Sequence, residues 1–404
     1  MPLEWFLAIR FLKEGRAQTA LIFGGVAVGV GVVVFLSALI TGLQASLVEQ
    51  TLGSQAHVVV RPPEEEARVV ERPAGAVLAV RRERTPQRVQ AIGQWQQVLE
   101  QARSVPGVIA AAPTVNGSAF ASRGSVTKAV SLRGVEAESY DRIVAVSRKL
   151  ELGLFRLAGA EAVIGKGLAD ELGLEVGDKL RLAGEGERAD VFTVAGIFDL
   201  GNKDVNQRWV FVPLRSAQNL LDLPGGVSTI ELRVEDYLKA DEAAQLVAAR
   251  TGLVAESWTE LNRQLLVALR SQSASSYMIQ FFVIVAVALG IASVLVVSVV
   301  QKSREVGILK AMGICTGMVQ RVFLIQGAIV GLVGSALGSA LGAGLALLFA
   351  NLAQNPDGSA LFPVDLNATL FLTATAVATV TGLVAAVAPA ARAARLDPAE
   401  VIHA

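Results

Sequence analysis

The chain has 404 residues, of which 52% are hydrophobic, and its 36 Lys and Arg residues balance 36 Asp and Glu residues. A net charge of zero argues against a nucleic-acid partner, because nucleic-acid binding normally requires a basic stripe. The single cysteine, Cys315, excludes a disulfide within one chain, so each domain must rely on an ordinary apolar core.

Residues 1–16 have the pattern of an amphipathic helix that lies in a membrane interface. The residues expected to face lipid are Trp5, Ile9 and Leu12, and those expected to face head groups are Arg10, Lys13 and Arg16.

Four long apolar runs follow, and none contains Asp, Glu, Lys or Arg. Each is long enough to cross a bilayer, since roughly 20 apolar residues span the ~30 Å hydrocarbon core. A cleaved signal peptide is the alternative for the first run, but its apolar stretch is longer than the usual ~7 to 15 residues. The runs cover residues 20–40, 277–300, 322–350 and 368–391.

Positive residues flank these runs mainly on one side, and Lys and Arg near helix ends stay preferentially in the cytoplasm. The loop 351–367 has no Lys or Arg and carries Asp357 and Asp365. Both termini are therefore expected in the cytoplasm, and residues from about 45 to 270 outside it. The positive flanks are Arg10, Lys13 and Arg16, then Lys302, Arg304, Lys310 and Arg321, and finally Arg392 and Arg395.

The predicted fold is therefore an α-helical membrane protein with four transmembrane helices and a large α/β extracytoplasmic domain inserted between the first and second helix. The predicted segments are the cytoplasmic interfacial helix 1–16, the first transmembrane helix with an outward extension 17–52, the outer domain 53–256, a stalk and second transmembrane helix 257–301, a cytoplasmic segment 302–321, the third helix 322–350, an outer loop 351–367, the fourth helix 368–391 and a cytoplasmic tail 392–404.

Within the outer domain, residues 158–234 are expected to be mixed α/β, and the segments 191–198, 209–212 and 230–234 alternate in the manner of half-buried strands. Residues 61–90 differ, with Pro62-Pro63, an acidic run and a basic run, and are read as a solvated loop or a docking site. The expected strands are 161–164, 179–182, 191–198, 209–212 and 230–234, and the expected helices are 166–172 and 216–223.

Two of the membrane helices are expected to reach beyond the bilayer. The sequence from Ser257 to Glu260 has the capping-box pattern, and residues 258–300 contain no proline, which predicts one helix about 65 Å long. The first helix likewise can continue past Gly42. Such extensions act either as levers or as a rigid stalk.

Small residues at four-residue spacing let membrane helices pack backbone to backbone. The glycines with this spacing are Gly25 and Gly29 in the first run and Gly327, Gly331, Gly334, Gly338 and Gly342 in the third.

Catalytic motifs are missing from this sequence. The only Gly-Lys pair, Gly165-Lys166, is followed by Gly167 and has Ala160 where a phosphate-binding loop has its first glycine. The expected topology places His57 and His403 on opposite sides of the membrane, so they cannot share a metal. The chain is therefore expected to be non-catalytic, with no metal and no cofactor of its own.

Several segments resemble the four-helix permeases of ABC transporters in the FtsX/MacB-like (type VII) superfamily, most of all its lipoprotein-releasing LolC/LolE branch. Residues 302–313 (KSREVGILKAMG) are similar to the cytoplasmic signature RE-x-x-I-L-(R/K)-x-(M/L)-G of these permeases. The other similar segments are the glycine ladder behind Gln326-Gly327, the tail 389–400, and the outer stretches 163–169 and 192–198.

The resemblance implies a permease subunit that works by mechanotransmission, with residues 302–313 as a coupling helix in a groove of a separate ATPase. ATP and Mg would be bound by a dimer of that subunit. A second permease, in a homo- or heterodimer, membrane lipids and a periplasmic protein are the other implied partners. The coupling residues would be Arg304, Glu305, Val306, Leu309, Lys310, Met312 and Gly313, with Val306, Leu309 and Met312 on one apolar face.

The substrate would be a lipoprotein, or another lipid-anchored or hydrophobic molecule, extracted from the outer leaflet of the inner membrane. Hooked members of the lipoprotein branch have a proline-containing hairpin where this chain has the proline-free turn 182–188. Two other functions remain open: a signal transducer that activates a periplasmic cell-wall hydrolase, and an adaptor-linked efflux permease. The residues expected to line a substrate cavity are Phe35, Leu39, Leu43, Tyr277, Ile279 and Phe282.

Overall fold

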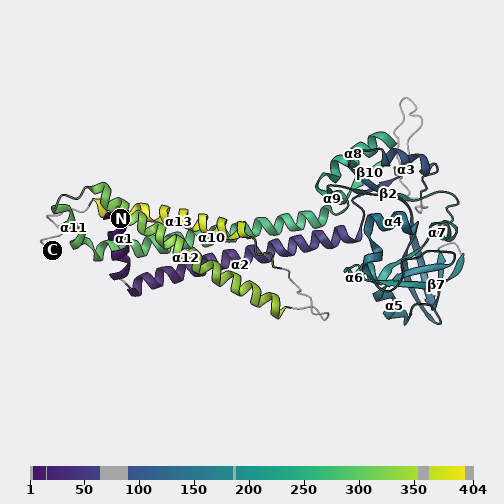
Figure 1. Ribbon diagram of the computed structural model, residues 1–404, viewed down its shortest axis with the longest axis horizontal. Helices are drawn as coiled ribbons and strands as arrows, with labels where there is room; N and C mark the ends of the chain where they lie inside the picture. The colour runs from purple at the N-terminus through teal and green to yellow at the C-terminus, as the bar shows by residue number, and fades with distance from the viewer. Residues whose placement is uncertain (1–2, 15, 64–89, 185–187, 354–363, 396–404) are drawn as a thin grey trace, which may run out of the picture. The chain divides into compact units, whose positions relative to one another are not determined.

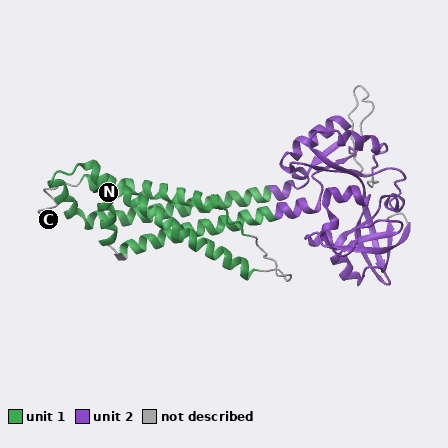
Figure 2. Cartoon of the chain, viewed as in Figure 1, with its two compact units in different colours: residues 1–46, 267–404 green, residues 47–266 purple. Residues whose placement is uncertain are grey.

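The computed structural model describes residues 3–14, 16–63, 90–184, 188–353 and 364–395 (Figure 1). The chain divides into two compact units (Figure 2). Met1–Ser46 and Val267–Ala404 form the helical unit, whereas Leu47–Leu266 form the α/β unit.

Among the described residues of the helical unit, four helices are long and apolar enough to cross a membrane. They are α2 (Arg16–Ser54), α10 (Arg263–Gln301), α12 (Thr316–Leu352) and α13 (Ala368–Ala394). Two shorter helices, α1 (Leu3–Glu14) and α11 (Ser303–Ala311), precede α2 and α12. The bundle is apolar inside, and its core includes Val30, Val34, Ile291, Leu295 and Val330.

The helices α2 and α10 each have 39 residues, which corresponds to about 58 Å of helix, well beyond the ~30 Å hydrocarbon core. The prediction of one helix from Trp258 onward is wrong, because α9 (Trp258–Leu261) is separated from α10 at Asn262. The Asn262 side-chain amide donates to the Trp258 carbonyl oxygen at 2.8 Å. Asparagine competes in this way with backbone hydrogen bonding and interrupts helices.

Side-chain hydrogen bonds connect α2 with α10 at three levels. Gln18 Nε2 donates to the Val294 carbonyl oxygen at 3.0 Å, near the start of α2. Gln280 Nε2 donates to Ser37 Oγ at 3.0 Å, further along both helices. Gln44 Nε2 donates to Ser273 Oγ at 2.7 Å. Polar contacts at three levels therefore follow the length of this helix pair.

The glycine ladder of α12 is divided between two neighbouring helices. A Cβ added at Gly331 would lie 2.5 Å from the Ala378 carbonyl oxygen of α13, and one at Gly327 would meet the Gly382 backbone. The other half of the ladder faces α2, and a Cβ at Gly338 would lie 2.7 Å from the Ala27 carbonyl oxygen. The helix α12 thus approaches α13 with one half and α2 with the other.

The remaining ladder glycines differ in their surroundings. Gly334 and Gly342 also face α2, where a Cβ would lie 2.5 Å from Val26 and 2.7 Å from the Gly31 carbonyl oxygen, respectively. Gly29 of α2 packs against Val287 of α10, whereas a Cβ at Gly25 would have no heavy atom within 4 Å.

The α/β unit is built on a 10-stranded sheet with the strand order β10-β1-β9-β2-β3-β8-β5-β7-β4, and β6 pairs with β2 and β7. The long strand β2 is antiparallel to β3, β6 and β9, whereas β8 pairs in parallel with β3. The strands are β1 (Val58–Arg61), β2 (Val108–Arg123), β3 (Val126–Val135), β4 (Leu150–Gly153), β5 (Glu161–Gly165), β6 (Lys179–Gly184), β7 (Ala189–Phe198), β8 (Trp209–Pro213), β9 (Thr229–Val234) and β10 (Val254–Ser257).

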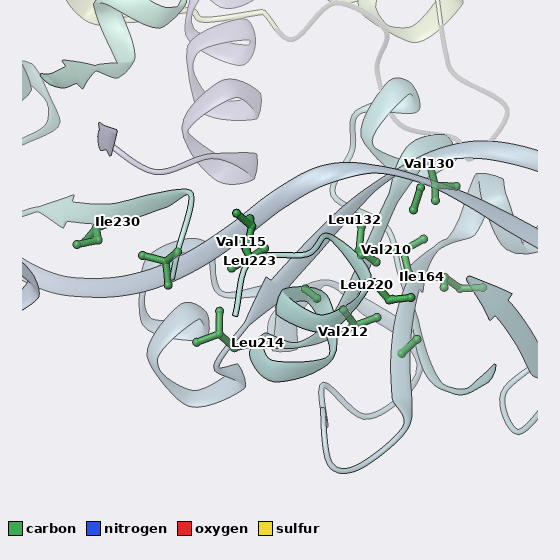
Figure 3. Close-up of a cluster of buried hydrophobic side chains, with 14 of the residues drawn as sticks. Val115, Val130, Leu132, Ile164, Val210, Val212, Leu214, Leu220, Leu223 and Ile230 are labelled. Carbon is green, nitrogen blue, oxygen red and sulfur yellow. The ribbon is translucent and has the colours of Figure 1, made fainter. Parts of the chain in front are cut away.

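Helices cover both faces of this sheet. Figure 3 shows part of the larger core, in which Leu132, Ile164 and Val212 of the strands meet Leu214 and Leu220 of α7. A second core lies against α4 and α6 on the other face. The helices are α3 (Trp95–Arg103), α4 (Ala137–Val144), α5 (Lys166–Leu172), α6 (Lys203–Arg208), α7 (Leu214–Leu220), α8 (Ala240–Thr251) and the short α9.

All five expected strands and the helix 166–172 are confirmed, with ends that differ by up to two residues. The expected helix 216–223 is shifted and runs as α7 from Leu214 to Leu220. The prediction of a half-buried strand is wrong for residues 209–212, which form β8, and the neighbouring strand β5 has the same surroundings. Val163 and Phe211 enter one core while their neighbours Ile164 and Val210 enter the other, so both strands are covered on both faces.

Four predicted segments fall partly or largely outside the described residues. These are the loop 61–90, of which 64–89 lie outside, the turn 182–188, of which 185–187 lie outside, the outer loop 351–367, of which 354–363 lie outside, and the tail 392–404, of which 396–404 lie outside.

Candidate functional site

The candidate site is centred on α11, which follows α10 and precedes α12 in the sequence. Val306 is only 1% exposed and packs with Val299 of α10 and Phe323 of α12. Leu309 is partly buried and packs on a small cluster with α1. The prediction of one outward apolar face is therefore wrong, because Val306 and Leu309 point into the chain whereas Met312 is 78% exposed.

The exposed side of α11 follows a four-residue spacing. Arg304, Ile308 and Met312 are all exposed, and residues four apart lie on one face of a helix. Glu305 is also exposed, beside Arg304. The helix ends before Gly313, whose φ of +95° is in the left-handed region that glycine adopts readily. The outward face of α11 therefore combines charge with two apolar side chains.

Lys302 immediately precedes α11 and joins it to α1. Its Nζ donates to Glu14 of α1 and to Glu305 Oε1 at 2.7 Å, and it lies 5.6 Å from the centre of the Phe11 ring. Hydrogen bonds from Lys302 and from the exposed Arg10 lower the pKa of Glu14. The hydrogen bonds to Glu14 and Glu305 raise the pKa of Lys302. The Lys302–Glu14 pair therefore stays charged around neutral pH.

The far end of α11 contacts the end of α13. Lys310 Nζ donates to the carbonyl oxygen of Ala394 at 3.0 Å, in the last turn of α13. Carbonyl groups at the C-terminal end of a helix carry partial negative charge and lack intrahelical donors, so a lysine there is favourable. Lys310, which was expected to contact a partner, is thus turned at least partly toward its own chain.

The helix α1 packs against α12. Ala8 and Phe11 are buried with Val322, and the buried Gln326 Nε2 donates to the Ala8 carbonyl oxygen at 3.4 Å. The Phe11 and Phe323 rings lie 6.4 Å apart. One face of α1 is therefore covered by protein.

This packing corrects part of the expected lipid-facing surface of α1. Trp5 is 44% exposed, as a lipid-facing residue would be. Ile9 is partly buried, and Leu12 packs against the bundle core. Lys13 is exposed, whereas the side chain of Arg16 lies outside the described side chains.

A cavity of about 220 Å³ lies among α2, α10 and α13. Its wall is mainly apolar, with Gly29 and Val287 on facing helices, and it includes the Ser37–Gln280 hydrogen-bonded pair. None of the expected cavity residues lines it. Phe35 instead meets Phe349 edge-on with ring centres 6.1 Å apart, Leu39 and Leu43 are partly buried, and Tyr277, Ile279 and Phe282 are each more than half exposed.

A buried ionic cluster lies within the α/β unit. Arg133 donates to Glu231 Oε1 at 2.7 Å, to the Tyr140 hydroxyl at 2.8 Å and to Asn116 Oδ1 at 3.1 Å. Its guanidinium carbon is 3.9 Å from the centre of the Trp209 ring. Burial raises the pKa of Tyr140 far above its usual range, which keeps its hydroxyl neutral. The cluster ties together β2, β3, β8, β9 and α4.

Residues that could bind a metal are scattered. Across the described ranges, no group of three or more His, Cys, Asp or Glu side chains is placed to hold an ion. His57 is 8% exposed, its Nδ1 lies 3.1 Å from the Val234 carbonyl oxygen, and burial lowers its pKa. Cys315 is exposed just before α12, and His403 lies outside the described residues.

Two family profiles together match most of the chain. The MacB-like periplasmic core domain matches residues 19–250, and the C-terminal part of FtsX-like permeases matches residues 277–398. The chain belongs to the FtsX-like permeases with a MacB-like periplasmic core domain. In this permease, α11 lies within the FtsX-like match, and the 10-stranded sheet lies largely within the core-domain match.

Several named proteins are similar to this permease. The lipoprotein-releasing system transmembrane protein LolC of Xylella fastidiosa is 24% identical, with 100% of this chain and 99% of that protein covered. The macrolide export ATP-binding/permease protein MacB of Hyphomonas neptunium is 27% identical over 97% of this chain and 59% of that protein. The extracellular domain of the ABC-type transporter YknZ from Gram-positive bacteria has a TM-score of 0.34 at 14% identity, with 50% of this chain and 99% of that domain covered.

Sequence reasoning missed several residues of the permease site. Ile308 completes the exposed face of α11, and its spacing from Arg304 and Met312 was the available signal. Ile308 was not chosen because the neighbouring apolar residues Val306 and Leu309 had been assigned to the docking face. Glu14 and Lys302 carry opposite charge near the ends of two predicted cytoplasmic segments, but nothing in the sequence placed them in contact.

Proposed function

We propose that this permease is the membrane subunit of an ATP-driven ABC transporter that extracts lipoproteins, or other lipid-anchored substrates, from the outer leaflet of the inner membrane. The observation that carries the proposal is the alignment with a lipoprotein-releasing LolC protein along essentially the full length of both chains. The four apolar helices and the core-domain match support a multi-pass inner-membrane protein. Both termini and α11 are on the cytoplasmic side in this proposal.

In the proposed complex, α11 docks in a groove of a separate dimeric ATPase, which binds ATP and Mg and performs the hydrolysis. Arg304, Glu305, Ile308 and Met312 make the contacts, since they form the exposed side of the helix. Gly313 closes the helix, and Val306, Leu309 and Lys310 hold it to the chain. An amphipathic helix with apolar anchors one turn apart suits a groove of this kind.

A second permease, identical or different, completes the proposed membrane part. Tyr277, Met278, Phe281 and Phe282 form an exposed, largely aromatic stretch of α10. In the proposal this stretch faces lipid, the acyl chains of the substrate or the second permease. The helices α2 and α10 carry the movement of the ATPase to the core domain, which is the proposed mechanotransmission. A periplasmic protein that accepts the released substrate is the remaining partner.

The test is to purify the chain with its co-purifying ATPase in lipid nanodiscs and to identify bound acylated peptides by mass spectrometry before and after ATP addition. The proposal expects triacylated peptides that ATP releases from the native complex. The Arg304→Glu/Met312→Glu variant should retain them, because its docking face is lost.

Lys239→Glu is the control, since it reverses one exposed charge in the α/β unit, outside α1 and α11, and should still release. If no acylated species is bound and a periplasmic protein stimulates the ATPase instead, extraction is wrong, and signalling or efflux replaces it. If the Arg304→Glu/Met312→Glu variant releases normally, α11 is not the docking helix.

A further inference from the structure

The contacts of α11 fix both of its ends to other parts of the helical unit. At its start, Lys302 bonds to Glu14 of α1 and to Glu305. At its end, Lys310 bonds to the Ala394 carbonyl oxygen of α13. Between these points, Val306 is buried among side chains of α10, α12 and α13. The helix therefore has few ways to move against its neighbours.

The helix α1 is in turn fastened to α12 along its length. Glu4, in its first turn, is paired with Arg321 at 3.7 Å, and the Ala8 carbonyl oxygen accepts from Gln326. Phe11, in its last turn, is buried against α12 and lies below the Lys302 ammonium group. A surface anchor needs only one apolar face toward lipid. These contacts are more than an anchor requires.

The position of Lys302 makes separation of α1 from α11 unfavourable. Its side chain is only 18% exposed, so its ammonium group depends on the two carboxylates that replace water. A shift of α11 away from α1 would remove Glu14 and leave a largely covered cation with one partner. It would also uncover Phe11, which contacts the lysine through its ring face.

We infer that α1 is a working part of the coupling apparatus and that Lys302 is its positioning residue. The ion pair with Glu14 makes α1, α11 and the adjoining ends of α12 and α13 move as one block when the ATPase moves α11. This inference rests on the proposed function, because it assigns a second helix to the same coupling step. The α1 segment is then a mechanical element and not only an anchor.

The first experiment tests the contact itself in the full chain in lipid nanodiscs, without an ATPase. A carbodiimide joins a carboxylate to an amine only when the two are already in contact. We expect a Glu14–Lys302 isopeptide bond, found by mass spectrometry as a link between α1 and the segment before α11, and no such link in Glu14→Gln. A link from Lys302 to Glu305 alone, or no link, would overturn the inference.

The second experiment measures the rate of ATP hydrolysis by the ATPase in complex with the permease. The permease variants are Lys302→Met, Glu14→Gln and the double variant. We expect each single variant to lower kcat at least about 5-fold, the low end of typical coupling between sites. The KM for ATP and the amount of assembled complex should not change. The double variant should be no worse than Lys302→Met, since Lys302→Met already removes the contact with Glu14.

Lys302→Arg should restore most of the rate, and Lys13→Met, which removes a nearby exposed lysine of α1, should behave as wild type. Additive losses, or a fall in assembly and thermal stability in proportion to the rate, would show a merely structural pair and overturn the inference. If the wild-type chain stimulates no ATPase at all, the proposed function fails. If it does so and the variants match it, only the inference fails.

Discussion

The contact between α12 and α13 gives a prediction that can be worked out from the structure. Replacing Gly331 by alanine would place a Cβ 2.5 Å from the Ala378 carbonyl oxygen. Close C–H···O contacts between helices normally have C···O distances of about 3.3–3.6 Å, so the two helices must separate by roughly 1 Å. A side-chain rotation cannot relieve this clash, because the Ala378 oxygen belongs to the backbone and the new Cβ is bonded directly to the backbone.

Such overpacking typically costs about 1–3 kcal/mol. Alanine also favours a helix over glycine by up to about 1 kcal/mol, which works in the opposite direction. Gly344→Ala, on the same helix, is the matched control because its Cβ would meet no heavy atom within 4 Å. The propensity gain is common to both variants, so Gly331→Ala should be less stable than Gly344→Ala by about 1–3 kcal/mol.

The assay is unfolding of the full chain by SDS titration in mixed micelles, followed by circular dichroism, with both variants measured against wild type. Equal stability of Gly331→Ala and Gly344→Ala would refute the reasoning, because it would mean that α12 and α13 do not meet backbone to backbone at this position.

Three further predictions concern the α/β unit and are each measured by thermal or chemical unfolding of the full chain. Arg133→Leu leaves Glu231 buried without its cation and should lower the free energy of unfolding by about 3–5 kcal/mol. Arg188→Leu, which breaks an exposed ion pair, should lower it by under about 1 kcal/mol. Similar losses in the two variants would contradict the role of burial. Burial lowers the pKa of His57 in the folded chain, so as pH falls the unfolded chain takes up this proton before the folded chain does. The folded state should therefore lose stability as pH falls below about 6.5. His57→Gln should flatten this pH dependence, and an unchanged slope would show that His57 does not cause it. Ser257→Ala removes the side-chain acceptor for the Glu260 amide and should cost about 1 kcal/mol, and no loss would show that other contacts hold the start of α9.

The sequence predicted elements well where one short pattern determines them. The helix 166–172 is bounded by Gly173, whose φ of +60° ends it, and strand 191–198 alternates in burial as far as Gly196. The long strand β2 was not predicted. Its segment is rich in alanine, and besides its hairpin partner β3 it pairs in antiparallel fashion with β6 and β9, which are distant in the sequence.

Which side chains of α11 are buried was harder to predict than the helix itself. Helical spacing grouped Val306, Leu309 and Met312 on one apolar face, but Val306 and Leu309 pack inward against neighbouring helices, which the pattern of α11 does not contain, whereas Met312 is exposed. Glycine spacing likewise showed where α12 is approached closely. It gave no indication that Gly31 and Gly382 are the opposing positions, because their own helices lack a long ladder.

The hydrogen bonds between α2 and α10 bear on how the chain assembles. The two helices are separated in the sequence by the whole α/β unit, so α2 enters the membrane long before α10 exists. From Gln18 to Gln44 the contacts extend over about 39 Å of helix, and a slip by one turn of ~5.4 Å would break the hydrogen bonds at all three levels at once. The side-chain amides of Gln18, Gln44 and Gln280 thus select one alignment of two helices that are otherwise mostly apolar.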